Sequence, residues 1–262
     1  GREVCCANKP MGNAGSTAKR LERAEKTGVL ALRDQGLEQL PERIFSVKTL
    51  RVCDLGNNKL LKLPDAVGKL NMLSTLSVDG NRLKMLPSII CTLGKLESLS
   101  AERNALTALP DALGSLKKLK KLNVGHNAIT ALPGSLGACS DLTSLDASHN
   151  TLTALPESFG QLKSLVQADF SFNKLSSPLV PGLDGLRRLK DLNMLENVAV
   201  LELPSELLRS TPLDHLQVDE HLLGVDGLLM PMDGRDDYVI RRKARIDKEM
   251  AGKAKGGDVS FH

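Results

Sequence analysis

Hydrophobic residues recur along most of the chain at fixed distances from a regularly spaced asparagine. Apolar residues stand eight, five and three positions before each asparagine and two positions after it, and from Asn58 to Asn150 a leucine also stands five positions after it. The interval is 23 residues through most of the series and 24 near its end. The anchors are Asn58, Asn81, Asn104, Asn127, Asn150, Asn173 and Asn197, and the same frame fits Gln35 before them and His221 after them. Nine frames at intervals of 23 or 24 residues predict a repeat protein rather than a domain with a single compact core.

Each frame predicts a short strand followed by a turn. The apolar residues five and three positions before the asparagine alternate as the inward side chains of a strand do. The asparagine amide carries donors and an acceptor, so in a stack it can pair with backbone groups of its own turn and of the neighbouring turn. A proline ends each of the first six frames, and stretches such as 65–72 and 157–164 then predict a small helical turn.

Stacking of these units predicts an α/β solenoid, with a curved parallel sheet on the concave side and short helices or turns on the convex side. We expect five parts: a flexible N-terminal extension (1–15), an N-terminal capping helix (16–27), nine repeats (28–231), a C-terminal cap helix (232–250) and a disordered tail (251–262). Ser16 or Thr17 would cap the first helix, and Tyr238 and Ile240 would cover the last repeat. Pro178 and Pro181 interrupt the frame and predict a local bulge.

The composition agrees with a stack of leucine layers. The chain of 262 residues holds 49 leucines but only five Phe, one Tyr and no Trp. No apolar run approaches the ~18 residues of a spanning helix, and we expect no secretory signal. Five cysteines without paired spacing predict neither a disulfide framework nor a zinc site, so we expect a reducing, cytoplasmic compartment.

The pattern L-x-x-L-x-L-x-x-N-x-L-x-x-L-P, as in 96–110 and 142–156, resembles the leucine-rich repeats of the 23-residue type common in cytoplasmic proteins. This resemblance covers about residues 28–225. The flanks at 24–44 and 236–246 resemble a smaller group of that family, leucine-rich-repeat-containing protein fifty-seven and its relatives. The family resemblance implies a non-catalytic scaffold that binds proteins.

The concave face of such an array consists of the side chains six, four, two and one positions before each asparagine. Ten of these are acidic and three are basic, although the whole chain carries a net charge of +4. We therefore expect this face to bind a basic protein partner, with one exposed aromatic ring as an apolar anchor. The predicted partner-binding residues are Asp54, Asp79, Glu102, Asp146, Asp169, Phe172, Asp191 and Asp219.

Stacking also brings His126 and His149 close to Ser148, Asp146 and Asp169, from which a metal pair or a hydrolytic triad can be drawn. A triad needs an oxyanion hole in a cleft, and a metal needs a closed ligand set, which an open sheet does not offer. We expect no catalysis, no metal, no cofactor and no small-molecule substrate. A basic run at 117–121 lacks aromatic stacking partners, so we expect no nucleic acid binding.

Residues 11–16 match the N-myristoylation pattern M-G-x-x-x-[ST], which requires translation to begin at Met11. An acyl chain on Gly12 would need a second signal to hold the protein at a membrane. That signal can come from Lys19, Arg20, Arg23 and Lys26. Two other functions stay open: a structural subunit of a cytoskeletal or ciliary assembly, and, by analogy alone, a regulatory subunit in a phosphatase or small-GTPase pathway.

Overall fold

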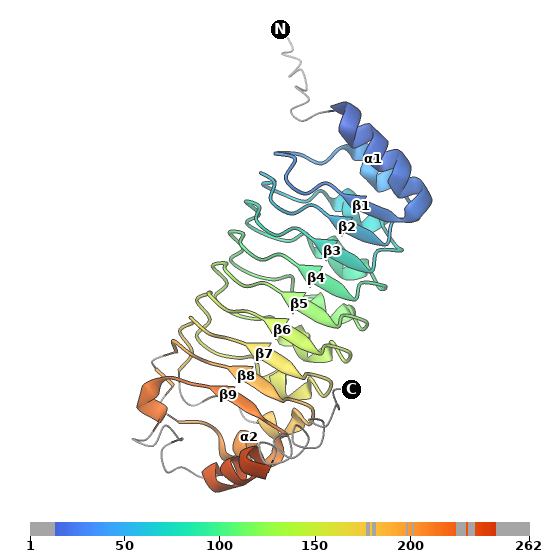
Figure 1. Ribbon diagram of the computed structural model, residues 1–262. Coiled ribbons are helices and arrows are strands. Elements are labelled where there is room, and N and C mark those ends of the chain that lie inside the picture. Colours follow the sequence, from blue (N-terminus) through green and yellow to red (C-terminus); the bar gives the residue numbers. More distant parts are fainter. Residues whose placement is uncertain are drawn as a thin grey trace, which may run out of the picture.

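The computed structural model describes residues 14–176, 179, 182–197, 199–200, 202–223, 229 and 234–244. Nine short parallel strands form one sheet in sequence order, which confirms the predicted solenoid (Figure 1). The strands are β1 (Val29–Ala31), β2 (Val52–Asp54), β3 (Thr75–Ser77), β4 (Ser98–Ser100), β5 (Lys121–Asn123), β6 (Ser144–Asp146), β7 (Gln167–Asp169), β8 (Asp191–Asn193) and β9 (His215–Gln217).

The register of the sheet follows the repeat length. Cys53 pairs with Leu76, and Leu76 pairs with Leu99, so each strand meets the equivalent residue of the next repeat. In β1 to β8 the middle residue is buried, and its two neighbours are at least partly exposed. Because side chains alternate along a strand, these neighbours form the concave surface.

Short helices form the outer side of the repeats (Figure 1). Proline directly precedes η1, η2, η3, η5, η6 and α2, where its fixed φ suits the start of a helical turn. These helices are η1 (Glu42–Ser46), η2 (Asp65–Lys69), η3 (Ser88–Thr92), η4 (Leu113–Ser115), η5 (Gly134–Ala138), η6 (Glu157–Gln161), η7 (Leu183–Gly185), η8 (Glu220–Leu222) and the α-helix α2 (Ser205–Ser210).

Asparagine side chains join neighbouring repeats, as Asn150 illustrates. Its Nδ2 donates to the carbonyls of Ala147 and Ser148 in its own turn and of Val124 in the preceding repeat, at 3.0–3.1 Å. Its Oδ1 accepts from the amide of Ile129 at 2.9 Å. Equivalent bonds form at Asn58, Asn81, Asn104, Asn127, Asn173 and Asn197. Each asparagine Oδ1 therefore pairs a backbone N–H group of the preceding repeat that leucine would leave unpaired.

The ends of the stack differ in detail from the prediction. The helix α1 (Ala14–Thr27) packs against β1 and includes Ser16 and Thr17, so neither residue is its N-cap. At the other end 235–244 is helical and Tyr238 is buried in the core. Ile240 is 67% exposed, so the prediction that it covers the last repeat is wrong. Gly12, Pro178, Pro181, the tail (251–262) and most of the extension lie outside the described residues.

Candidate functional site

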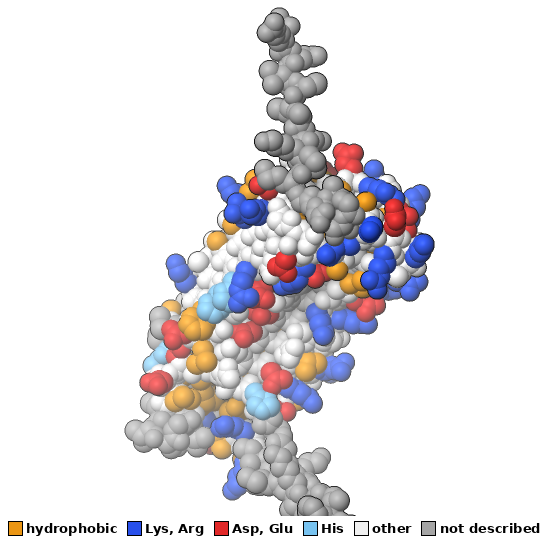
Figure 2. Space-filling view, turned by 45° about the horizontal axis from the view of Figure 1, so that its top comes forward, with side chains coloured by type: hydrophobic (Ala, Val, Ile, Leu, Met, Phe, Trp, Pro, Cys, Tyr) orange, Lys and Arg blue, Asp and Glu red, His pale blue; other side chains and the backbone are white. Residues whose placement is uncertain are grey.

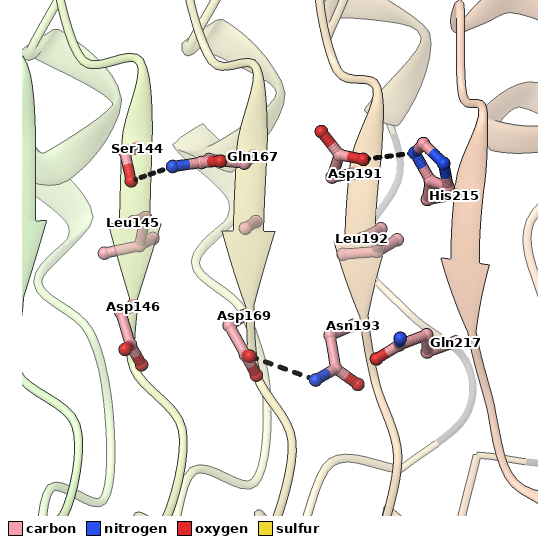
Figure 3. A pocket seen from close by; sticks show the side chains of 11 residues that line it. Ser144, Leu145, Asp146, Gln167, Asp169, Asp191, Leu192, Asn193, His215 and Gln217 are labelled. Carbon is pink, nitrogen blue, oxygen red and sulfur yellow. Dashed lines mark hydrogen bonds and ion pairs between the residues drawn. The ribbon is translucent and has the colours of Figure 1, made fainter.

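A groove of about 580 Å³ runs across the concave face of β6 to β9 (Figure 3). Three carboxylates line it, those of Asp146, Asp169 and Asp191, together with amide and hydroxyl groups and the imidazole of His215. No Lys or Arg belongs to this lining. The groove is therefore acidic, and Leu145, Ala168 and Leu192 add apolar surface to its lining.

Side chains on adjacent strands are bonded to one another across the groove (Figure 3). The Gln167 amide donates to the Ser144 hydroxyl at 2.7 Å, and the Asn193 amide donates to Asp169 at 3.0 Å. A ring nitrogen of His215 lies 2.5 Å from an oxygen of Asp191. These contacts fix the orientation of the polar groups before any partner arrives, which lowers the entropic cost of binding.

Several of the predicted binding carboxylates also shape the turn after their strand. Asp54, Asp146 and Asp169 each accept a hydrogen bond from the backbone amide two residues later, at 2.9–3.0 Å. The hydroxyls of Ser148 and Ser171 donate to the same oxygens of Asp146 and Asp169, at 2.7 and 2.6 Å. Such bonds are typical of turns that begin with Asp or Asn. The recurring D-x-S spacing could have revealed this second role in the sequence.

Two other predicted residues are also engaged within the chain. Asp79 accepts from the hydroxyls of Ser77 and Ser100 and from the amide of Glu102, at 2.6–2.8 Å. Glu102 itself lies 2.8 Å from a guanidinium nitrogen of Arg103. These acids give the face its charge, and Asp79 also holds neighbouring repeats together.

Asp219 ends the series of repeats. Its two carboxylate oxygens accept from the backbone amides of Glu196 and Asn197, at 2.6 and 2.9 Å. His221, which the frame marks as the ninth anchor, is exposed and lies in η8, with a ring nitrogen 2.7 Å from the carbonyl oxygen of Val200. The last frame therefore has no buried amide at the anchor position.

The residue just before each of the first eight anchors adopts a left-handed backbone, which the hydrophobic pattern did not predict. Its φ lies between 51° and 60° wherever it is not glycine, and the one glycine of the column, Gly80, has a φ of 61°. The other members are Asp34, Asn57, Arg103, His126, His149, Phe172 and Glu196. Asn and Gly tolerate this conformation, whereas Arg, His and Phe carry a steric cost. The column is thus strained at the positions where its rings stand.

Three rings of this column stack on one another. The rings of His126 and His149 have centroids 4.0 Å apart and planes at 11°. The rings of His149 and Phe172 have centroids 4.2 Å apart and planes at 7°. Phe172 remains 47% exposed, so the stack presents an aromatic surface to solvent at the edge of the groove face. The periodicity placed the two histidines one strand apart, and the same frame could have added Phe172.

This arrangement suits binding rather than chemistry. Parallel rings in face-to-face contact do not direct their nitrogens at a common ion, and the Ser148 hydroxyl donates to Asp146. Within the residues that the structure describes, no group of three or more His, Cys, Asp or Glu side chains could hold a metal ion. In the same part of the chain, no helix has the length and apolar character to span a membrane.

Charge is divided between the middle of this surface and its edges. Figure 2 shows acidic side chains near the middle of the face and Lys and Arg side chains mainly at its borders. Two lysines of the basic run at 117–121 are engaged within the chain: Lys120 lies 2.8 Å from Glu97, and the Lys117 ammonium donates to the Ala138 carbonyl at 2.9 Å. The hydrogen bond between the Lys120 ammonium and the Glu97 carboxylate lowers the pKa of Glu97 and raises the pKa of Lys120.

Comparison with protein families identifies the class. A model described as leucine-rich repeat region matches residues 14–128, and a model described as leucine rich repeat matches residues 141–162. The leucine-rich repeat domain of the type III effector XopL is 30% identical, with a TM-score of 0.67 over 76% of this chain and 71% of that one. The chain belongs to the leucine-rich repeat proteins.

Two further solved structures share this fold. A leucine-rich repeat protein of Leptospira interrogans is 26% identical over 88% of this chain and 74% of that chain, with a TM-score of 0.56. The ectodomain of a membrane receptor kinase from Arabidopsis thaliana, solved in complex with Casparian strip integrity factor 2, is 29% identical with a TM-score of 0.59. The match covers 68% of this chain but only 23% of that one. No curated protein matches the chain significantly.

Proposed function

We propose that this protein is a non-catalytic scaffold whose concave face, at β6 to β9, binds a basic segment of a protein partner. The observation that carries the proposal is the groove of about 580 Å³, lined by three carboxylates and by neither Lys nor Arg. Leucine-rich repeat domains typically mediate protein–protein interactions, and the Arabidopsis ectodomain was solved in complex with Casparian strip integrity factor 2. Both matched family models describe repeats, not enzymes.

The groove favours an extended, positively charged segment. Complementary charge would speed the encounter and reject acidic competitors. The exposed ring of Phe172 supplies an apolar contact, of the aromatic kind that often dominates binding energy. The partner would thus combine Lys or Arg side chains for the groove with an apolar group for the ring stack.

Charge reversal inside the groove tests the proposal without disturbing the turns. Gln167 and Asp191 begin β7 and β8, and their side chains bond to other side chains of the groove rather than to a turn. The double variant Gln167→Lys/Asp191→Lys should therefore fold normally. A matched control, Asp111→Lys/Gln161→Lys, makes the same change in charge at exposed positions of the outer side.

The readout is the amount of each crosslinked native partner recovered with the full chain. We expect the groove variant to recover at least ten-fold less of a basic partner, while the control recovers it as wild type does. Equal recovery with both variants would reject the concave groove as the binding surface.

We also propose that Gly12 carries an N-acyl chain, that the protein works in the cytoplasm, and that it belongs to the protein fifty-seven group. The support is the M-G-x-x-x-[ST] match at 11–16, the unpaired buried cysteines and the two flanks. Mass spectrometry of the native N-terminal peptide tests the acylation. A native protein whose translation starts upstream of Met11 would exclude it.

A further inference from the structure

Two adjacent repeats carry a mixed basic and apolar patch on the segments that follow their strands. Leu61 is 63% exposed and Met85 is 68% exposed, and they are two of the five exposed large hydrophobic residues in the described part of the chain. Lys59, Lys62, Arg82 and Lys84 surround them in sequence, and all four are exposed. We call these six residues the basic–apolar patch.

Backbone contacts bring the two halves of the patch side by side. The amide of Arg82 donates to the carbonyl of Leu60 at 2.9 Å, which joins the second and third repeats directly at this flank. Leu60 and Leu83, which lie between the exposed positions in sequence, are buried in the core, whereas the six patch residues are exposed to solvent. Figure 2 shows hydrophobic side chains beside Lys and Arg side chains along the upper left edge of the molecule.

The patch is confined to these two repeats. The equivalent positions of the next three repeats hold only small, uncharged residues: Ala105, Thr107, Ala108, Ala128, Thr130, Ala131, Thr151, Thr153 and Ala154. Folding alone therefore does not require long cationic or large apolar side chains there. Within the described residues, no ion pair involves any of the four cations, so their charge is available to a ligand.

We propose that the basic–apolar patch docks on the surface of an anionic lipid bilayer. Four positive charges complement acidic headgroups, and the projecting side chains of Leu61 and Met85 can enter the boundary between headgroups and acyl chains. A protein partner fits less well, because protein interfaces are depleted in Lys and enriched in aromatic residues, and this patch has three Lys and no aromatic ring. The inference is independent of the concave groove and of acylation at Gly12.

The test measures binding of the full chain, produced without an acyl group, to sedimented vesicles. One set of vesicles contains phosphatidylserine in phosphatidylcholine, and the other contains phosphatidylcholine alone. Each Lys near an anionic surface contributes about a five-fold change in binding. Lys62→Gln/Lys84→Gln should therefore lower binding to the phosphatidylserine vesicles about 25-fold. Lys118→Gln/Lys163→Gln, which removes the same charge elsewhere on the surface, should change it less than two-fold.

A second variant separates insertion from charge. Leu61→Ser/Met85→Ser leaves the net charge unchanged and, because both side chains are exposed, should leave the fold intact. We expect it to lower vesicle binding at least ten-fold. The proposal is overturned if wild type shows no preference for phosphatidylserine, if both lysine variants lose binding equally, or if the serine variant binds as wild type.

Two controls distinguish a lipid surface from an acidic protein and from the concave groove. Patch variants that bind vesicles normally but lose binding to polyglutamate would assign the patch to an acidic protein and overturn the lipid proposal. Gln167→Lys/Asp191→Lys should still bind vesicles at least as well as wild type, so a failure of the concave groove and a failure of the patch give different results.

Discussion

The imidazole ring of His149 lies flat against the ring of Phe172, with centroids 4.2 Å apart and planes at 7°. The two residues occupy the same position of successive repeats, and both have a left-handed backbone, with φ of 51° and 54°. A non-glycine residue pays a steric cost in this conformation. The turn therefore does not require a ring at these positions, because a residue that adopts the left-handed conformation at lower cost, such as Asn57 in the second repeat, forms the same turn.

Replacement of Phe172 should separate binding from stability. Phe172→Ala removes one stacking contact of a half-exposed ring, so we expect a loss of about 1 kcal/mol in the free energy of unfolding. A ring that anchors a partner typically contributes about 2 kcal/mol or more, which is roughly a 30-fold loss of affinity. Titration of the isolated partner and urea denaturation measure the two effects. Leu61→Ala, which removes an exposed apolar side chain outside the groove, should leave the affinity unchanged.

Loss of one asparagine amide should destabilise the stack severely. Asn150→Leu leaves the amide of Ile129 without an acceptor and removes one of two donors from each of the carbonyls of Val124, Ala147 and Ser148. A buried unpaired group costs about 1–3 kcal/mol, and each lost hydrogen bond costs about 0.5–1.5 kcal/mol. We expect a total loss of about 3–5 kcal/mol, measured by urea denaturation. The control is Gln35→Leu, because the side-chain amide of Gln35 donates to the carbonyl of Arg33 in its own turn. A loss below about 1 kcal/mol for Asn150→Leu would contradict the role assigned to the ladder.

Close approach of two outer turns requires glycine at position 160. A Cβ built on Gly160 would lie 2.0 Å from the carbonyl oxygen of Gly182, a backbone atom that can move only with its turn. Gly160→Ala should therefore cost about 2–3 kcal/mol in the free energy of unfolding. At Gly134 a Cβ would meet nothing within 4 Å, so Gly134→Ala should be neutral or slightly stabilising. Thermal melts of the two variants that coincide would refute this difference.

Buried thiols should make the protein less stable at alkaline pH. Burial raises the pKa of the Cys53 thiol to about 12, with a smaller contribution from the Asp54 carboxylate, and burial raises the pKa of the Cys139 thiol to about 11. Between the ordinary thiol value of 9.0 and these values the unfolded chain releases protons that the folded chain retains. Stability should fall across this window by up to about 1.4 kcal/mol per pH unit for each thiol.

Urea midpoints measured from pH 8 to pH 11 check this sign. Cys53→Ala should reduce the slope above pH 9, while a slope unchanged by the substitution would assign the alkaline loss to other groups. Native Cys53 should also react with a thiol reagent only after unfolding, since its side chain is buried.

The fold could be predicted from the sequence because every frame requires the same leucines to be buried and the same side-chain amide to pair with the backbone of the turn. Leucine at fixed offsets has one way to be buried, and Asn150 and its equivalents recur where the chain must turn. The left-handed column was not predicted, because its side chains are as different as the carboxylate of Asp34 and the ring of Phe172. The members share only their backbone conformation. Ile240 failed as a cover because helical spacing alone does not say which face meets the core, whereas Tyr238 does meet it.

The candidate site was predicted in its charge but not in its construction. Counting acidic side chains on the inferred concave columns found Asp146, Asp169 and Asp191. It did not show that two of these also fix the turns after their strands, since that depends on hydrogen bonds to backbone amides. The groove over β6 to β9 likewise depends on how side chains pack between strands.

Photo-crosslinking from single positions of the full chain, in its native cells, tests most directly whether the concave groove binds the partner. Gln217 lies in the groove and Asp111 is exposed on the outer side. We expect a photo-crosslinking amino acid at Gln217 to capture a partner through a segment rich in Lys or Arg, and the same probe at Asp111 not to capture it. Capture of the same partner from Asp111 and not from Gln217 would contradict binding in the groove.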